Sequence, residues 1–268
     1  MKDILQRLRN ERPTILTVTT RSWDAASYDQ VGAPMTEMAA AVLGRLPLAG
    51  DETVLDAGCG TGRVCELLLD RLPGGRVIAV DADPEMVQFA RQNLGDRAEV
   101  RRLDLLQLRL DEPVDAVLST ATFHWILDHE QLFARLFESL RPGGRLVAQC
   151  GGRGNIASLR RAGEEVGGKR PFVSWFDEWS PPWYYAGPEE TIERLEAVGF
   201  RSVQAWLQPW PVVPNDPAEY LATVTLGAQV QRLPRELRDD YVQAVLERLD
   251  EPVTVDYVRL NLEAVRPM

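Results

Sequence analysis

The stretch of sequence that decides the fold is "VLDAGCGTGR", Val54 to Arg63, in which an apolar run leads into three glycines. Glycine loses more backbone freedom on folding than any other residue, so a cluster of glycines indicates tight backbone or a close neighbour. In open α/β sheets, a strand that passes through a glycine-rich loop into a helix forms a ligand site, because the helix amides and the missing side chains admit a ligand. We therefore expect a ligand to account for these glycines.

Around this loop, residues 53 to about 150 alternate short apolar runs with helical patterns, which is typical of a parallel sheet with crossover helices. Asp83 and Pro84 are predicted to begin a helix that ends at Gly95, and Asp128 with Gln131 begins another. Two helices are expected within residues 217–250. The expected strands cover residues 53–57, 76–81, 98–104, 115–120, 145–150, 201–210 and 257–265.

The composition limits the classes of partner. The chain has 268 residues and a formal net charge of −10, which disfavours nucleic acid and anionic membrane surfaces as partners. Its three cysteines form no disulfide framework or metal-ligand spacing, and with only two histidines we predict no metal site. The sequence has no apolar stretch of transmembrane length, so we expect a cytoplasmic protein.

Two classes of cofactor compete for the glycine loop. A dinucleotide loop needs G-x-G-x-x-G, but the sixth position is Arg63 when counted from Gly58 and Cys65 when counted from Gly60. A nicotinamide-dependent oxidoreductase is therefore disfavoured. The loop reads D-x-G-x-G-x-G instead, from Asp56 to Gly62.

This motif resembles the first motif of the class I S-adenosylmethionine-dependent methyltransferases, and the resemblance covers nearly the whole chain from about residue 22. In that family an acidic residue at the end of the second strand binds the ribose hydroxyls, and another after the third strand contacts the adenine amine. The resemblance assigns these roles to Asp81 and Asp104, although the first could merely cap a helix and the second merely turn the chain. The cofactor-binding residues that it implies are Asp56, Gly58, Cys59, Gly60, Asp81, Ala82, Asp104, Leu105 and Ser119.

The acceptor is expected near "STATFHWILDHE", residues 119–130, after the fourth strand. The D/N/S-P-P-Y/F pattern of DNA-amine methyltransferases is absent there. The stretch resembles the trans-aconitate methyltransferases and related small-molecule enzymes, as do "RPGGRLVAQ" and "PEETIERLEAVGF". Those enzymes usually carry glutamine where this chain has His124. His124 is our candidate for a general base or an acceptor-orienting group, the alternative being a hydrogen-bonded structural histidine. His129 is expected at the surface.

Aromatic side chains gather in "PFVSWFDEWSPPWYY", residues 171–185. They could form a cap over the acceptor or the core of a small satellite cluster. Trp23 and Tyr28 fall where related enzymes place a helix that closes the cofactor pocket, and plain packing of that helix is the alternative. The substrate-binding residues predicted on this basis are Tyr28, Trp125, Trp175, Trp179 and Tyr184.

The resulting prediction is a Rossmann-like, doubly wound sheet of seven strands, mostly parallel with a reversed last strand, and an aromatic-rich cap insertion. Residues 1–22 would be an N-terminal extension and 23–268 the methyltransferase domain, with a core at about 50–150, a cap at about 151–186, and C-terminal helices and strands at 187–268. The function predicted is in-line methyl transfer from S-adenosylmethionine to a small carboxylate or a bulkier aromatic or terpenoid metabolite. The alternative is a non-catalytic cofactor-binding module that regulates a partner.

Overall fold

The fold is centred on one seven-stranded sheet, seen in a computed structural model that describes residues 33–268. The strand order is β3-β2-β1-β4-β5-β7-β6, and the neighbouring strands from β3 to β5 pair in parallel. β7 runs antiparallel to both of its neighbours, which confirms the predicted reversed last strand. The strands are β1 Thr53–Ala57, β2 Arg76–Asp81, β3 Glu99–Arg102, β4 Val114–Thr120, β5 Leu140–Gly151, β6 Arg201–Val212 and β7 Val255–Val265.

Helices cover both faces of the sheet, which is why its central strands are apolar along their whole length. One face packs against α3 (Ala33–Leu43), α4 (Arg63–Arg71) and α5 (Pro84–Leu94). The other face packs against α6 (His129–Ser139) and α9 (Pro188–Val198). Short 3₁₀ turns lie at η1 Gly95–Arg97, η2 Leu105–Gln107 and η3 Phe123–Trp125.

The predicted helix starts are confirmed. The Asp83 side chain accepts hydrogen bonds from the amides of Glu85 and Met86 at the start of α5, and Gly95 ends that helix. Asp128 accepts from the amide of Gln131 at 2.9 Å at the start of α6. Such caps satisfy amides that have no partner inside the helix.

The region 217–250 differs from the expectation of two helices. It forms α10 Pro217–Tyr220, the π-helical turn η4 Leu221–Thr225, α11 Gly227–Arg232 and α12 Arg235–Leu246. Pro234 separates the last two, because proline has no amide hydrogen with which to continue the preceding helix.

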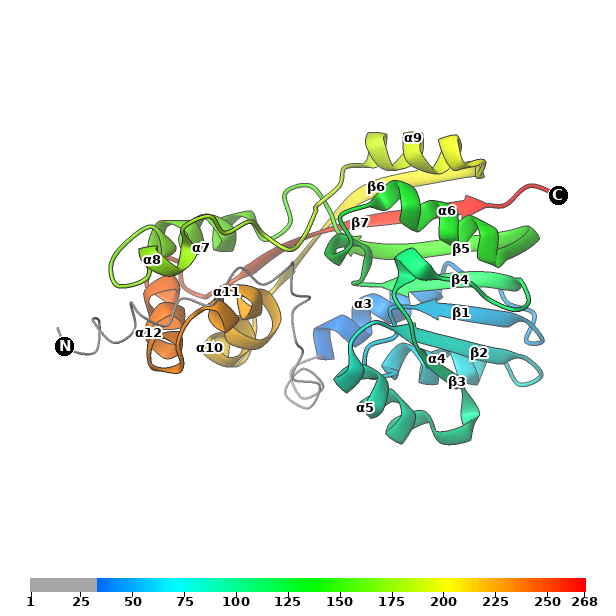
Figure 1. Ribbon diagram of the computed structural model, residues 1–268, viewed down its shortest axis with the longest axis horizontal. Coiled ribbons are helices and arrows are strands. Elements are labelled where there is room, and N and C mark those ends of the chain that lie inside the picture. The colour runs from blue at the N-terminus through cyan, green and yellow to red at the C-terminus, as the bar shows by residue number, and fades with distance from the viewer. Residues whose placement is uncertain (1–32) are drawn as a thin grey trace.

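A separate helical lobe stands at one end of the sheet (Figure 1), composed of α10, α11 and α12 together with α7 (Ala157–Gly167) and α8 (Val173–Phe176). Its own core includes Leu159, Phe172, Leu226 and Tyr241. β7 pairs with β5 only as far as Arg259, opposite Gly151, whereas its pairing with β6 continues to Val255. The β6–β7 ribbon therefore leaves the sheet and enters the lobe. The segment predicted as a cap forms only part of this lobe.

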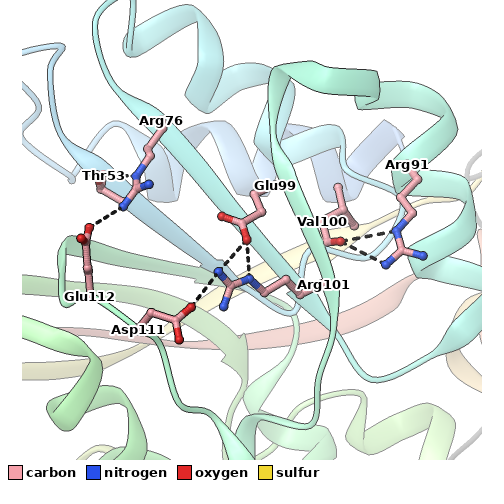
Figure 2. A network of polar contacts seen from close by, with 8 residues as sticks. All are labelled: Thr53, Arg76, Arg91, Glu99, Val100, Arg101, Asp111 and Glu112. Atoms are coloured by element: carbon pink, nitrogen blue, oxygen red, sulfur yellow. Dashed lines mark hydrogen bonds and ion pairs between the residues drawn. The ribbon is translucent and has the colours of Figure 1, made fainter.

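Polar contacts tie the outer strands to the segment that follows η2 (Figure 2). Arg76 contacts Thr53 at 3.1 Å and Glu112 at 3.3 Å, and Arg101 pairs with Asp111 at 3.6 Å. Exposed pairs of this kind contribute about 0–1 kcal/mol each. Their effect is to hold the chain between η2 and β4 against the edge of the sheet. Among the helices that the structure describes, none is long and apolar enough to cross a membrane.

Candidate active site

The three glycines of the loop differ in what surrounds them. Gly58, Gly60 and Gly62 have φ values of 87°, 53° and 91°, a region that side chains disfavour. A Cβ at Gly58 would lie 2.1 Å from the Thr122 hydroxyl, and one at Gly62 would lie 2.9 Å from Leu94. A Cβ at Gly60 would meet nothing within 4 Å. Our expectation that a ligand explains all three is therefore corrected: packing within the protein explains two, and Gly60 alone faces open space.

Asp81 fastens the loop to the end of β2. One of its carboxylate oxygens accepts from the Gly60 amide and the other from the Asp83 amide, both at 2.9 Å. Burial raises the pKa of this carboxyl, although the amide hydrogen bonds oppose the shift. A carboxylate has about four lone-pair sites. Acceptor capacity therefore remains for a ligand hydroxyl such as that of a ribose.

Asp56 is a buried carboxyl on the side of β1 that packs against α4. The Cys65 thiol donates to its Oδ2 at 3.0 Å, while its Oδ1 has no hydrogen-bond partner within the part of the chain that the structure describes. Burial raises the pKa of Asp56 to about 7, and the neighbouring charge of Asp81 adds to that rise. An orphaned carboxylate oxygen next to the loop suits a cationic ligand.

The other predicted cofactor residues have mixed surroundings. Asp104 is exposed and accepts from the Leu106 amide at 2.9 Å, so it caps the 3₁₀ turn η2, in agreement with the alternative that it merely turns the chain. Leu105 is buried and Ala82 is exposed. The Ser119 hydroxyl is buried and donates to the Ala57 carbonyl at 2.6 Å, so it joins β4 to β1. Cofactor contacts by these residues stay predictions.

A cavity opens beside the glycine loop, with about 570 Å³ of empty space including its mouth. Gln149 of β5 and Arg259 of β7 line it at the edge of the sheet where β1 and β4 end, and sequence reasoning missed both. Each is a polar residue inside an otherwise apolar strand pattern, which was the available signal. The remaining lining residues are Met35, Thr36, Met38, Ala39, Gly58, Cys59, Gly60, Thr61, Arg63, Val64, Thr120 and Ala121.

Ala121 has a strained backbone at the wall of this cavity. Its φ of 54° is in the left-handed region, although it is not glycine. Its amide donates to the Gln149 carbonyl at 2.7 Å, which holds the strained turn against β5. Strain of this kind costs on the order of 1–3 kcal/mol and is concentrated at functional sites. The turn after β4 is therefore shaped for the cavity rather than for local stability.

His124 is not among the described residues that line the cavity. Its Nδ1 accepts from the Gly151 amide at 3.2 Å, so the neutral ring carries its proton on Nε2. The ring contacts Trp125 and Tyr185, with centroids 4.9 and 5.7 Å away. This hydrogen bond matches the structural alternative for His124, and a catalytic role stays a prediction.

The expectation that His129 lies at the surface is wrong. It is 3% exposed, and its Nε2 donates to the Phe123 carbonyl at 3.0 Å. Tyr184 covers the first turn of α6, with its ring centroid 5.2 Å from that of His129. Burial lowers the pKa of His129. The covering residue lies more than fifty positions away in the sequence, so local patterns could not reveal this burial.

The predicted substrate-binding aromatic residues belong to a chain of ring contacts. Trp125 contacts Trp183, Trp183 contacts Trp179, and Trp179 contacts Phe176, with centroid separations of 6.0, 5.7 and 5.6 Å. Phe176 in turn stacks on Tyr241 of α12 at 5.4 Å. The chain thus connects η3 with the helical lobe, as the satellite-core alternative describes.

Tyr184 and Trp175 also have structural partners. The Tyr184 hydroxyl donates to Glu190 on α9, and the Trp175 carbonyl accepts from Arg232 at 2.9 Å. None of the four aromatic residues Trp125, Trp175, Trp179 and Tyr184 is among the described residues that line the cavity. Their contact with substrate stays a prediction. Tyr28, Trp23 and residues 1–22 lie outside the described residues.

Together, the sheet order with its reversed β7, the glycine loop and the acidic end of β2 define a nucleoside-binding α/β fold of the class I methyltransferase type. The family model "Methyltransferase domain" matches residues 55–148. The malonyl-[acyl-carrier protein] O-methyltransferase of Acetivibrio thermocellus is 31% identical over 193 residues, which are 68% of this chain and 67% of that protein. The chain belongs to the class I S-adenosylmethionine-dependent methyltransferases, and S-adenosylmethionine is its cofactor.

Two further comparisons describe its relatives. The trans-aconitate 2-methyltransferase of an Azoarcus species is 38% identical over 128 residues, which are 48% of this chain and 50% of that protein, so the match spans half of that relative. Among solved structures, a Haemonchus contortus phosphoethanolamine N-methyltransferase with bound S-adenosylhomocysteine has a TM-score of 0.61 at 17% identity, and the match covers 91% of this chain and 57% of that one. That likeness shows the fold alone.

The residues present fit the cofactor. Gly60 leaves open space above the loop, and Asp81 retains acceptor capacity for a ligand hydroxyl. The unpartnered Oδ1 of Asp56 offers a further hydrogen-bond acceptor close to the loop. S-adenosylmethionine carries an ammonium and a sulfonium, and carboxylates favour both, whereas they would repel the pyrophosphate of a dinucleotide.

Proposed function

We propose that this chain methylates a carboxylate oxygen of a small, anionic acceptor. The observation that carries the proposal is the chemistry of the cavity beside the cofactor loop. Its described lining contains two arginines and neither a histidine, a lysine nor a carboxylate. A carboxylate acceptor is already ionised at neutral pH and needs no base, whereas a phenol or an amine must lose a proton.

The cavity thiol does not supply a base either. The Cys59 thiol hydrogen-bonds with Cys65, which lowers its pKa, but burial and two neighbouring carboxylates outweigh this and raise the pKa overall. Cys59 therefore stays a neutral thiol at pH 7. The names of two relatives agree with the proposal, since trans-aconitate and a malonyl group both contain a free carboxylate.

Gly60 and Asp81 would hold the cofactor, with Asp104 at its adenine end and Asp56 behind the loop. When bound, S-adenosylmethionine supplies a methyl group activated by a positively charged sulfur. The protein's part is to position the acceptor oxygen and exclude water, which lowers the entropic cost of the encounter. The chain has a net charge of −10, which repels anions at long range. An anion in the cavity would therefore be held by the two arginines that line it.

The alternatives have less support. A non-catalytic module predicts a cavity filled by its own side chains, yet the described residues leave a cavity open beside the loop. A bulky aromatic or terpenoid acceptor would need the aromatic residues to line the cavity, and those described pack against one another. The three buried, free cysteines favour a reducing compartment, so we propose a cytoplasmic site of action.

The test is an acceptor panel measured across pH. The full chain is incubated with S-adenosylmethionine and, separately, with trans-aconitate, a phenol and an amine, and the release of S-adenosylhomocysteine is followed from pH 6 to 9. We expect methylation of the carboxylate only, at a rate that has no rising limb in this range. Methylation of the phenol or the amine with a limb that rises through neutral pH would contradict the proposal.

A further inference from the structure

Arg259 is a buried cation that forms no ion pair with the residues that the structure describes. It lies on β7 with 3% exposure, and its Nε has no hydrogen-bond partner among residues 33–268. The described residues offer it no ion pair, and its guanidinium carbon lies 5.6 Å from the ring centroid of Tyr257. Charged side chains are almost never buried unless they are paired. The missing counter-charge is therefore expected from a ligand.

The neighbours of Arg259 on its face of the sheet are already paired with one another. Side chains alternate along a strand, so Arg259, Asn261 and Glu263 share the face that packs against α3. Glu263 forms an ion pair with Arg45 at 3.0 Å. Asn261 accepts from Gln149 at 2.8 Å and donates to Gln208 at 3.2 Å. The polar row is thus satisfied except at Arg259, where β7 leaves β5.

The titratable groups near Arg259 are neutral. Burial raises the pKa of the Cys150 thiol to about 12, even though the positive charge of Arg259 opposes the rise. Burial likewise raises the pKa of the Tyr185 hydroxyl, which Asn155 and the arginines oppose. Neither side chain is an anion at neutral pH, so the positive charge of Arg259 is not compensated from within the described structure.

Arg259 lines the cavity, so the compensating anion can come from a molecule bound there. A guanidinium matches the planar geometry of a carboxylate and binds it through two parallel hydrogen bonds. Two carboxylates could occupy the cavity: that of the cofactor's amino-acid group and that of the acceptor. β7 lies three strand spacings from β1, roughly 14 Å at about 4.8 Å per spacing, and Arg63 stands next to the loop on the cofactor side. This arrangement favours the acceptor.

The carboxylate held by Arg259 is not the one that reacts. A guanidinium bound to a carboxylate withdraws charge from its oxygens and makes them poorer nucleophiles. We propose that Arg259 binds a second carboxylate of the acceptor, one that is not methylated, and thereby selects polycarboxylates over monocarboxylates. This inference rests on the proposed function and adds to it the number of acidic groups that the acceptor must carry.

The test compares Arg259→Gln, Arg259→Lys and the control Arg45→Gln, which removes an arginine from the same face outside the cavity lining. Calorimetry on the full chain measures the binding of S-adenosylhomocysteine and then of trans-aconitate to the protein saturated with it. For Arg259→Gln we expect the Kd of trans-aconitate to rise roughly ten- to 150-fold, the loss of a hydrogen-bonded charge pair. The Kd of S-adenosylhomocysteine should stay within about twofold. Arg259→Lys should restore part of the affinity, and Arg45→Gln should bind like the wild type.

Kinetics give an independent measurement. Crotonate is a monocarboxylate of similar skeleton, and its KM should be high in the wild type and unaffected by Arg259→Gln. If Arg259→Gln fails to fold, the Arg259→Lys variant and the wild-type preference for trans-aconitate over crotonate still test whether Arg259 binds a second carboxylate. A raised Kd for S-adenosylhomocysteine alone would assign Arg259 to the cofactor and overturn the inference, as would equal use of both acids by the wild type. Arg259-dependent binding of trans-aconitate without any methylation would instead refute the proposed function and leave this site standing.

Discussion

Replacement of Asp81 by alanine should damage the cofactor site more than a residue that touches only the ligand would. Asp81 holds the Gly60 and Asp83 amides at 2.9 Å each, so its loss releases the one loop residue that faces open space. Loss of charge-assisted hydrogen bonds to a ribose diol costs on the order of 1.5–3 kcal/mol, roughly a ten- to 150-fold rise in Kd. The freed loop adds a loss of stability of about 1–3 kcal/mol.

Calorimetry with S-adenosylhomocysteine measures the first effect, and thermal unfolding without ligand measures the second. Asp104→Ala is the matched control, because its exposed side chain holds one turn amide and its loss should weaken the cofactor without lowering the Tm appreciably. A folded Asp81→Ala protein that binds S-adenosylhomocysteine as tightly as the wild type would refute the reasoning, and so would stabilisation of the wild type by NAD in its place.

Three further predictions concern buried groups. The folded pKa of Asp56 is about 7 against an ordinary value of 3.8, so the folded state binds the extra proton and stability falls as pH rises through 7. Between pH 5 and pH 8 the free energy of unfolding, measured with urea, should fall by about 2–3 kcal/mol less in Asp56→Asn than in the wild type. An equal fall with pH in both proteins would contradict the raised pKa. His124→Gln should keep cofactor affinity and a pH-independent kcat, because Nδ1 of His124 already accepts from the Gly151 amide. A hundredfold fall in kcat would instead show that His124 acts as a general base. Trp179→Ala should lower stability by about 1–3 kcal/mol with an unchanged KM, since its ring contacts Phe176 and Trp183; an unchanged Tm with a raised KM would make the aromatic residues a substrate cap.

Local sequence patterns were enough to predict the sheet and the cofactor loop. Caps at Asp83 and Asp128 depend on residues within three positions, and apolar runs bounded by turn residues located the strands. The D-x-G-x-G-x-G spacing identified the loop, but not that Gly58 and Gly62 are required by Thr122 and Leu94. Those contacts join segments far apart in the chain, and periodicity contains no information about them.

The acceptor side was predicted less well for the same reason. Gln149 and Arg259 line the same cavity as the loop only because β5 lies beside β4, and β7 beside β5, in the sheet. The aromatic stretch was singled out as a possible cluster, but Tyr241, on which its Phe176 stacks, comes from a distant segment of the helical lobe. In both cases the sequence contained unusual residues, but only the fold shows which of them line the cavity and which pack against one another.

We expect this chain to transfer a methyl group from S-adenosylmethionine to a carboxylate oxygen in a cavity whose described lining contains no general base. The most direct measurement uses S-adenosylmethionine with a deuterated methyl group, trans-aconitate and the full chain, followed by mass spectrometry of the acid product. We expect one deuterated methyl per acceptor, released by mild alkali as expected of an ester, with one S-adenosylhomocysteine formed for each. A label that resists alkali, or tight binding of S-adenosylhomocysteine without labelling of any small carboxylate, would contradict it.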